Sequence, residues 1–430
     1  MSQEKSNNIL PIIVMIFLFG MISFVTNLAS PMGDILKNQF QVANWIGTLG
    51  VFANFIAYAI MGIPAGNILQ KIGYKKTALV AVSVGFIGIG IQTISGYAAS
   101  FSIYIIGAFI AGFSMCLLNT VVNPMLNKLG GGGNRGNQLI QMGGSFNSLC
   151  GTAVIIISGL LIPNTIAEAK ISDVFPLMYT ALAIFAFAFI VILLTTIPEN
   201  EKISQDNTLQ KSSSGPMSYR HFVLGAIAIF IYVGVEVGIP NVMNKWLQNP
   251  VLDILGNVDD EDIAASMAGT YWFLMLIGRL IGAAVGKNVS AKSMLSFASI
   301  VSIILVILAI LLPTNILMHM PVFNGANGFG LVNVPLCASL LVFVGLCTSV
   351  MWGGIFNLAV EGLGNSTEKA SGIFMALVCG GGILPLIQNA IVDTTGTAYQ
   401  ASYWIIVAGL AYILFYALIG SKQVKKNITI

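Results

Sequence analysis

Glu236 is a carboxylate in the middle of an apolar run, FIYVGVEVGIP, which covers residues 230–240. An ionisable group at that depth in a membrane helix costs roughly 2.5 to 3.5 kcal/mol on insertion scales unless a partner or a water-filled cavity receives it. A desolvated carboxyl group can exchange a proton, whereas an ionised one can bind hydroxyl groups or ligate Na⁺ together with carbonyl oxygens. A third interpretation makes Glu236 structural, held by Tyr232 and neighbouring Asn side chains.

Asp34 is the second candidate for binding a coupling ion. It lies in NLASPMGDIL, at the end of an apolar run, and the helical period places it on one face with Asn27 and Ser30. Polar side chains in a lipid-buried helix turn toward the interior of the bundle. The alternative is that Asp34 lies in water at the end of its helix.

Side-chain amides recur in several apolar runs, and they suggest a polar cavity. Asn119 and Asn123 are one turn apart in LLNTVVNPML, and Gln141 and Asn147 follow in NQLIQMGGSFNSLCG. Amides supply the donors and acceptors that an uncharged, polyhydroxylated solute requires. Trp352, like Trp272, lies far from the expected membrane surface and could stack on the apolar face of a sugar. The predicted solute contacts are Asn27, Asn119, Asn123, Gln141, Asn147, Glu236, Asn241, Trp352, Asn357 and Gln388.

Each of these residues also has a plainer interpretation. Asn and Ser side chains hold membrane helices together by hydrogen bonds, and a buried Trp can simply pack or face lipid. The clustering of polar residues in four runs favours a cavity. Arg279, in GRLIG, is expected at the inner end of its helix, where it would serve gating contacts rather than the solute.

The composition is that of a membrane protein. Of the 430 residues, 56% are hydrophobic and only 8% are charged, against roughly 25% charged residues in soluble domains. The apolar runs are long enough to cross the bilayer as helices and lack the alternation of barrel strands. We predict an all-α protein with twelve membrane-spanning helices, at 9–36, 43–69, 77–98, 101–127, 139–162, 173–197, 219–247, 263–288, 293–313, 335–359, 369–392 and 400–421.

Basic residues indicate the orientation, because Lys and Arg accumulate in cytoplasmic loops. With a cytoplasmic amino terminus, the outer loops hold only Lys37, Lys170 and Lys245. We therefore expect a multi-pass protein of the cytoplasmic (inner) membrane with both termini cytoplasmic. A basic stripe interleaved with aromatic residues is missing, so nucleic acid is not an expected partner. We expect a monomer in the lipid bilayer.

The longest polar break between predicted helices divides the chain. Residues 198–220 are rich in Ser, Asn, Gln and charge, which is typical of a flexible linker. It separates a six-helix bundle at 1–197 from a second one at 221–430. Many transporters are built from such halves, with the substrate between them near the midplane of the membrane. A Gly- and Asn-rich loop at 314–335 is expected to be irregular.

Catalysis and metal binding have little support in the sequence. The two histidines, His221 and His319, lie at a membrane border and in an outer loop, and the five cysteines show no metal-binding spacing. We expect neither an enzyme nor a cofactor or metal.

Several motifs together resemble a known family. They are NTVVNPMLNKLG, FNSLCG, YVGVEVG, GTYWFLMLIGRLIG, SVMWGGIFNLAVEGLG and CGGGILP. In order and spacing the chain is similar to the fucose-galactose-glucose:proton symporters of the major facilitator superfamily. The resemblance implies two six-helix bundles, alternating access, and import of a neutral sugar driven by an ion gradient.

The chain departs from the family pattern at three positions. Ser30 stands where the resemblance implies an Asp, and Asn119 where it implies a Glu. Gly144 replaces a Gln, with Gln141 one turn earlier. Two family carboxylates are thus replaced, whereas glucose- and galactose-type relatives look similar at Glu236.

The predicted function is secondary active import of a neutral sugar such as a hexose or deoxyhexose, coupled to H⁺ or Na⁺. The alternatives are a proton antiporter that exports amphipathic compounds, an uncoupled sugar facilitator, and a membrane sensor that binds sugar without moving it.

Overall fold

The computed structural model describes residues 9–39, 49–98, 100–161, 171–199, 215–249, 260–323, 328–395 and 398–423. Its first helices are α2 (Ile9–Gln39), α4 (Leu49–Ile72), α5 (Tyr74–Tyr97), α6 (Phe101–Leu129), α7 (Gly133–Leu161) and α8 (Phe175–Leu194), the last preceded by the short helix η2 (Ile171–Val174). The second group opens with η3 (Pro216–Ser218) and continues with α9 (Arg220–Leu247), α10 (Asp260–Val285) and α11 (Ala291–Leu311).

The last three membrane segments are each built from more than one piece. They are α12 (Leu336–Thr348) with α13 (Met351–Val360), η5 (Gly364–Ser366) and α14 (Thr367–Leu377) with α15 (Gly380–Thr395), and α16 (Tyr399–Ser402) with α17 (Trp404–Phe415) and η6 (Tyr416–Gly420). The break before α15 lies at a run of glycines. A Cβ atom on Gly380 would come 2.0 Å from the carbonyl oxygen of Phe230, so a larger residue would push α15 away from α9.

Together these segments form the twelve helices expected from the sequence. Eleven of them, among the described residues, are long and apolar enough to cross a membrane. The first four turns of α7 carry amide, hydroxyl and glycine residues. Its polar side chains can be tolerated only where other helices or a cavity cover them.

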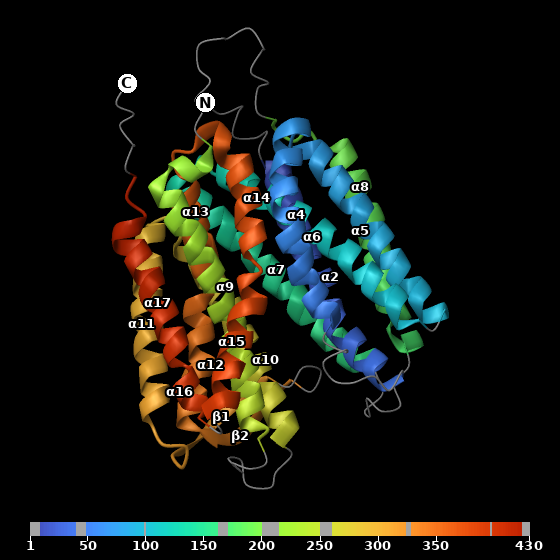
Figure 1. The fold of residues 1–430 in the computed structure, drawn as a ribbon. Coiled ribbons are helices and arrows are strands. Elements are labelled where there is room, and N and C mark those ends of the chain that lie inside the picture. Colours follow the sequence, from blue (N-terminus) through green and yellow to red (C-terminus); the bar gives the residue numbers. More distant parts are fainter. Residues whose placement is uncertain are drawn as a thin grey trace.

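The helices form two groups that stand side by side (Figure 1). One group runs from α2 to α8 and the other from α9 to η6. The groups touch at the end where α2 begins and η6 ends, and they lean apart toward the opposite end. Contacts between them come chiefly from α4 with α14 and from α7 with α10.

Glycines bring α4 and α14 close together where Gly62 and Gly66 contact Gly372 and Ala376. We call this end of the molecule the closed end. A Cβ atom on Gly372 would lie 2.6 Å from the Gly62 carbonyl oxygen and from the Gly66 Cα atom. Such small residues allow helix backbones to approach closely in membranes. Nearby, the Ser371 hydroxyl donates to the Thr120 carbonyl at 3.1 Å, which adds a polar contact between the groups.

The closed end is also joined by side chains of other helices. The Tyr74 hydroxyl donates to the buried Glu368 carboxylate at 3.2 Å, and the Gln138 amide donates to the Ala283 carbonyl at 3.0 Å. These contacts link the two groups on the α2-start side of the molecule.

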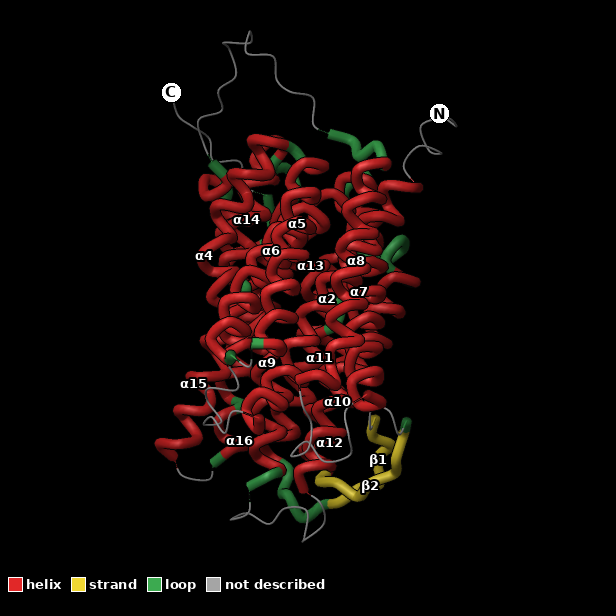
Figure 2. Tube along the Cα trace, turned by 90° about the vertical axis from the view of Figure 1, so that its right-hand side faces the viewer, coloured by secondary structure: helices red, strands yellow, loops and turns green. Residues whose placement is uncertain are grey.

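The loop expected to be irregular at 314–335 is instead a β-hairpin, so that prediction was wrong. Strands β1 (Leu317–Phe323) and β2 (Phe329–Pro335) pair antiparallel at the end opposite the closed end (Figure 2). Met320, Val322 and Val334 alternate toward the bundle and are buried. The Phe323 backbone N–H also donates to the Thr270 hydroxyl of α10 at 2.7 Å. Pairing between strands depends on contacts that the local Gly and Asn content does not show.

Substitution of Gly372 by Val tests the closed end. The added side chain has no room against Gly62 and Gly66. Overpacking costs about 1–3 kcal/mol, which should raise the population of molecules opened at this end about 5- to 150-fold. Thr120, buried in the structure, reports the opening when it is replaced by Cys in a background without the native cysteines. Its labelling by a maleimide should accelerate accordingly.

The matched control is Gly90→Val, because a Cβ atom on Gly90 meets nothing within 4 Å. The control should leave the labelling rate unchanged. Equal rates in the two Val variants would contradict the packing role of Gly372.

Candidate functional site: a cavity between the two helix groups

A cavity of about 750 Å³ lies between the two groups of helices. Its volume is in the range of ordinary small-molecule sites, about 300–1,000 Å³. The first group contributes residues of α2, α4, α6 and α7, and the second contributes residues of α9, α10 and α13. The polar or aromatic residues that line it include Ser23, Thr26, Asn27, Tyr58, Asn119, Gln141, Asn147, Ser148, Thr152, Glu236, Trp272, Arg279, Ser349 and Trp352.

Six of the predicted solute contacts line this cavity. They are Asn27, Asn119, Gln141, Asn147, Glu236 and Trp352. A seventh, Asn123, is buried directly behind Trp352, whose indole N–H donates to the Asn123 Oδ1 atom at 3.0 Å. That bond joins α13 to α6, so Trp352 is held at the boundary between the two groups.

Three predicted contacts lie elsewhere. Asn357 accepts a hydrogen bond from Asn127 on the closed-end side of the cavity. Asn241 is exposed and accepts one from Asn389 at 3.2 Å. Gln388 is buried against Ser402, to which its amide donates at 3.2 Å.

Asp34, the second predicted ion-binding residue, belongs to α2 by its backbone. Its side chain lies outside the part of the chain whose side chains are described.

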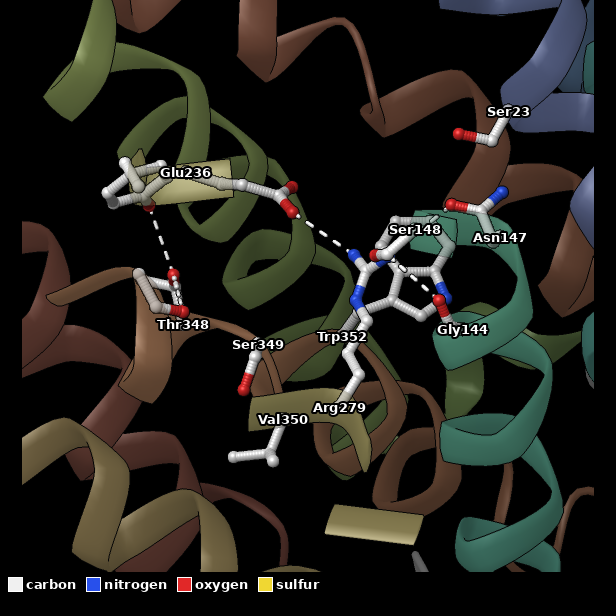
Figure 3. Close-up of polar contacts among 12 residues, drawn as sticks. Ser23, Gly144, Asn147, Ser148, Glu236, Arg279, Thr348, Ser349, Val350 and Trp352 are labelled. Atoms are coloured by element: carbon white, nitrogen blue, oxygen red, sulfur yellow. Dashed lines mark hydrogen bonds and ion pairs between the residues drawn. The ribbon is translucent and has the colours of Figure 1, made fainter. Parts of the chain in front are cut away.

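Glu236 and Arg279 both line the cavity, and their side chains point toward each other (Figure 3). The Nη2 atom of Arg279 lies 3.4 Å from the Glu236 Oε1 atom, and the two side chains are only 13% and 12% exposed. This is a long contact for a charge-assisted hydrogen bond, which is usually about 2.7–2.9 Å. The ion pair between Glu236 and Arg279 is therefore longer than a well-formed one.

Arg279 also reaches the opposite group of helices. Its Nη1 atom donates to three oxygens of α7, namely the Ser148 hydroxyl at 2.6 Å, the Gly144 carbonyl at 3.2 Å and the Asn147 Oδ1 atom at 3.3 Å. Glu236 and Arg279 belong to α9 and α10, so one guanidinium group connects α7 with the second group of helices (Figure 3).

The prediction for Arg279 was wrong, because Arg279 lines the cavity instead of standing at the inner end of its helix. Side chains of a helix lean toward its N-terminus, and this long side chain therefore extends back into the cavity. Gly144 lies directly against it, since a Cβ atom there would be in ordinary van der Waals contact with the Arg279 Cδ atom at 3.4 Å, and a long side chain would occupy the same space. Arg279 thus lies against α7 at Gly144, the residue that departs from the family pattern.

The cavity amides are fixed by other parts of the bundle. The Asn119 amide donates to the Tyr58 hydroxyl at 2.7 Å, and the Asn147 amide donates to the Phe19 carbonyl at 2.8 Å. The Gln141 amide donates to the Val350 carbonyl of the other group at 2.9 Å. These anchors set which amide atom faces the cavity. Tyr58 escaped the sequence analysis, because a lone Tyr in an apolar run carries no signal of a polar role.

Tyr232, expected as a possible partner of Glu236, lies close enough to the carboxylate to interact with it. Its hydroxyl is buried and forms no hydrogen bond of standard geometry with the described residues. Among those residues there is also no group of three or more His, Cys, Asp and Glu side chains that could hold a metal ion.

Comparison with known proteins identifies the family. Residues 12–385 match the family model described as Major Facilitator Superfamily. The chain belongs to the major facilitator superfamily. The fold, the family resemblance and the expectation of a transporter rather than an enzyme are confirmed by this membership and by the relatives described next.

Two relatives of this superfamily chain match over nearly all of its length. A putative glucose/galactose transporter of Helicobacter pylori is 30% identical over 98% of this chain and 99% of the relative. An L-fucose-proton symporter of Escherichia coli is 23% identical over 91% of this chain and 89% of the relative.

Solved structures of the superfamily share the fold. The transporter FucP in the outward conformation superposes with a TM-score of 0.80 at 18% identity, covering 97% of this chain and 100% of FucP. The proton:xylose symporter XylE gives a TM-score of 0.65 at 14% identity, covering 97% of this chain and 98% of XylE.

Substitution of Ser148 by Ala tests how α7 holds Arg279. The change removes the shortest bond to the guanidinium group, and a hydrogen bond to a charged group contributes about 1.5–3 kcal/mol. The Tm of the purified protein, followed by tryptophan fluorescence, should fall. Thr152→Ala is the control, because the Thr152 hydroxyl bonds only the backbone of its own helix. A Tm loss no larger than that of the control would contradict the bridge.

Proposed function

We propose that this superfamily member imports a neutral sugar together with a proton across the cytoplasmic membrane. The observation that carries the proposal is the Glu236–Arg279 pair in the wall of a cavity between the two groups of helices. The substrate class is a hexose, a deoxyhexose or a related saccharide. Two relatives support this class, namely the putative glucose/galactose transporter and the L-fucose-proton symporter.

The chemistry of the cavity suits a polyhydroxylated solute. Asn27, Asn119 and Gln141 offer amide groups, and Trp272 and Trp352 offer flat apolar faces. Sugars present hydroxyl groups at their edges and C–H groups on their faces, so both kinds of side chain are useful. A cavity for amphipathic drugs would have less need of anchored amides.

Alternating access follows if the two groups rock against each other around the cavity. We assign the groups to residues 1–197 and 221–430, with 198–220 as the cytoplasmic linker. The positive-inside rule puts the closed end at the cytoplasm. In that orientation both termini are cytoplasmic and the described conformation faces outward.

The proton is a better coupling ion than Na⁺ for Glu236. A sodium site would need several oxygen ligands around the carboxylate, but a guanidinium group already lies 3.4 Å from it. A cation in that position repels a metal ion. Protonation requires no extra ligands. Asp34 remains the alternative coupling residue.

Substitution of Glu236 by Gln tests the proposal in proteoliposomes. The native protein should accumulate a labelled hexose, chosen from a panel that includes glucose, galactose and fucose, when a proton gradient is imposed. Glu236→Gln should lose gradient-driven accumulation, because Gln cannot exchange a proton, while it still exchanges sugar across the membrane. Uptake under a sodium gradient is measured in parallel.

Glu361→Gln is the matched control, since it removes an exposed carboxylate beyond α13. It should leave accumulation unchanged. If the native protein only equilibrates sugar under every gradient, the chain is an uncoupled facilitator. Failure of every sugar to move would contradict the proposed substrate class.

A further inference from the structure

Arg279 has hydrogen-bonding capacity to spare toward the cavity. A guanidinium group has five N–H donors, and the two on Nη1 serve the three oxygens of α7. The Nη2 atom has only the long contact with Glu236, and Nε–H has no acceptor among the described residues. Two or more donors of Arg279 are therefore open to a hydroxylated ligand in the cavity.

Glu236 has a single charged partner among the described residues. Its only ion-pair partner among the described residues is Arg279 at 3.4 Å. Tyr232 and Tyr271 are the other titratable groups near it, both uncharged phenols, and the Tyr232 hydroxyl interacts with the carboxylate. The charge of Glu236 is thus balanced by one loosely bound guanidinium group.

These facts make the ion pair and a bound sugar competitors. Sugar hydroxyl groups that accept from Nη2–H and Nε–H would share the Nη2 atom with Glu236, whose contact with it is already long, and would draw Arg279 away from Glu236. A poorly hydrated carboxylate that loses its cationic partner takes up a proton more readily. In reverse, a protonated Glu236 leaves the Nη2–H groups free for the sugar.

We propose that Arg279 is the positioning residue that links sugar binding to proton binding, by exchanging its contact with Glu236 for sugar hydroxyl groups. The inference rests on the proposed function. Linkage of this kind is reciprocal, so the sugar favours protonation as strongly as protonation favours the sugar. Because α7 holds the other side of the guanidinium group, Arg279 turns rather than leaves the cavity.

The experiment counts protons taken up when sugar binds. Purified protein is titrated by calorimetry with the transported hexose at pH 6 to 9, in pairs of buffers that differ in ionisation enthalpy. The native protein should take up protons over the pH range in which Glu236 is charged before the sugar binds. Over that same range its sugar affinity should fall as the pH rises, by up to about tenfold per pH unit, as one linked proton requires.

Arg279→Gln should bind sugar with much less proton uptake and with an affinity that depends little on pH, since the sugar then displaces no cation from Glu236. Arg279→Lys keeps the charge but not the fork of donors. It should retain proton uptake and bind sugar about tenfold more weakly, as expected for one lost charge-assisted hydrogen bond. If Arg279→Gln does not fold, this Lys variant still tests the inference.

Lys245→Gln is the control for loss of a basic side chain, because Lys245 binds Asn389 away from the cavity lining. It should behave like the native protein. Proton uptake by Arg279→Gln equal to that of the native protein would overturn the inference while leaving proton-coupled transport intact. Absence of sugar binding to the native protein would instead overturn the proposed function.

Discussion

A guanidinium group inside a membrane-spanning bundle must find oxygen acceptors, and this requirement organises the cavity. Arg279 finds them on α7, through Ser148, Asn147 and the Gly144 carbonyl, and on α9, through Glu236. Truncating one member of a buried charged pair is costly because it leaves the other charge without compensation. Ser148, Asn147 and the Gly144 carbonyl of α7, together with Glu236, all bind this one cation.

The closed end and the cavity are parts of a single mechanical arrangement. Gly62 and Gly66 lie against Gly372 at the closed end, while Gln141 and Trp352 bond across the groups at the cavity itself. Close backbone packing gives a firm contact without charged groups. The hydrogen bonds of Gln141 and Trp352 at the cavity are individually weak, because a hydrogen bond contributes only about 0.5–1.5 kcal/mol net to stability. Contacts of that strength can be exchanged as the two groups move.

Local patterns in the sequence predicted much of this fold. Apolar runs located the helices, as at 101–127 for α6 (Phe101–Leu129), because burial in lipid demands a continuous apolar stretch. The depth of Glu236 in such a run pointed to a cavity. The partner of Glu236 was missed, because Arg279 is 43 residues away and its direction depends on how α10 packs against α7. The hairpin was missed for a similar reason, because the pairing of β1 with β2 depends on contacts that the local composition does not show.

The polar helix α7 has a consequence for how the protein is made. Its first four turns carry amide, hydroxyl and glycine residues, and it packs closely on α2, where a Cβ atom on Gly20 would overlap the Phe146 ring at 2.5 Å. Polar residues enter the bilayer at low cost only when other helices cover them. We therefore expect the polar turns of α7 to enter the membrane most readily when α2 already lies beside them, so that the first group of helices inserts as a cooperative unit.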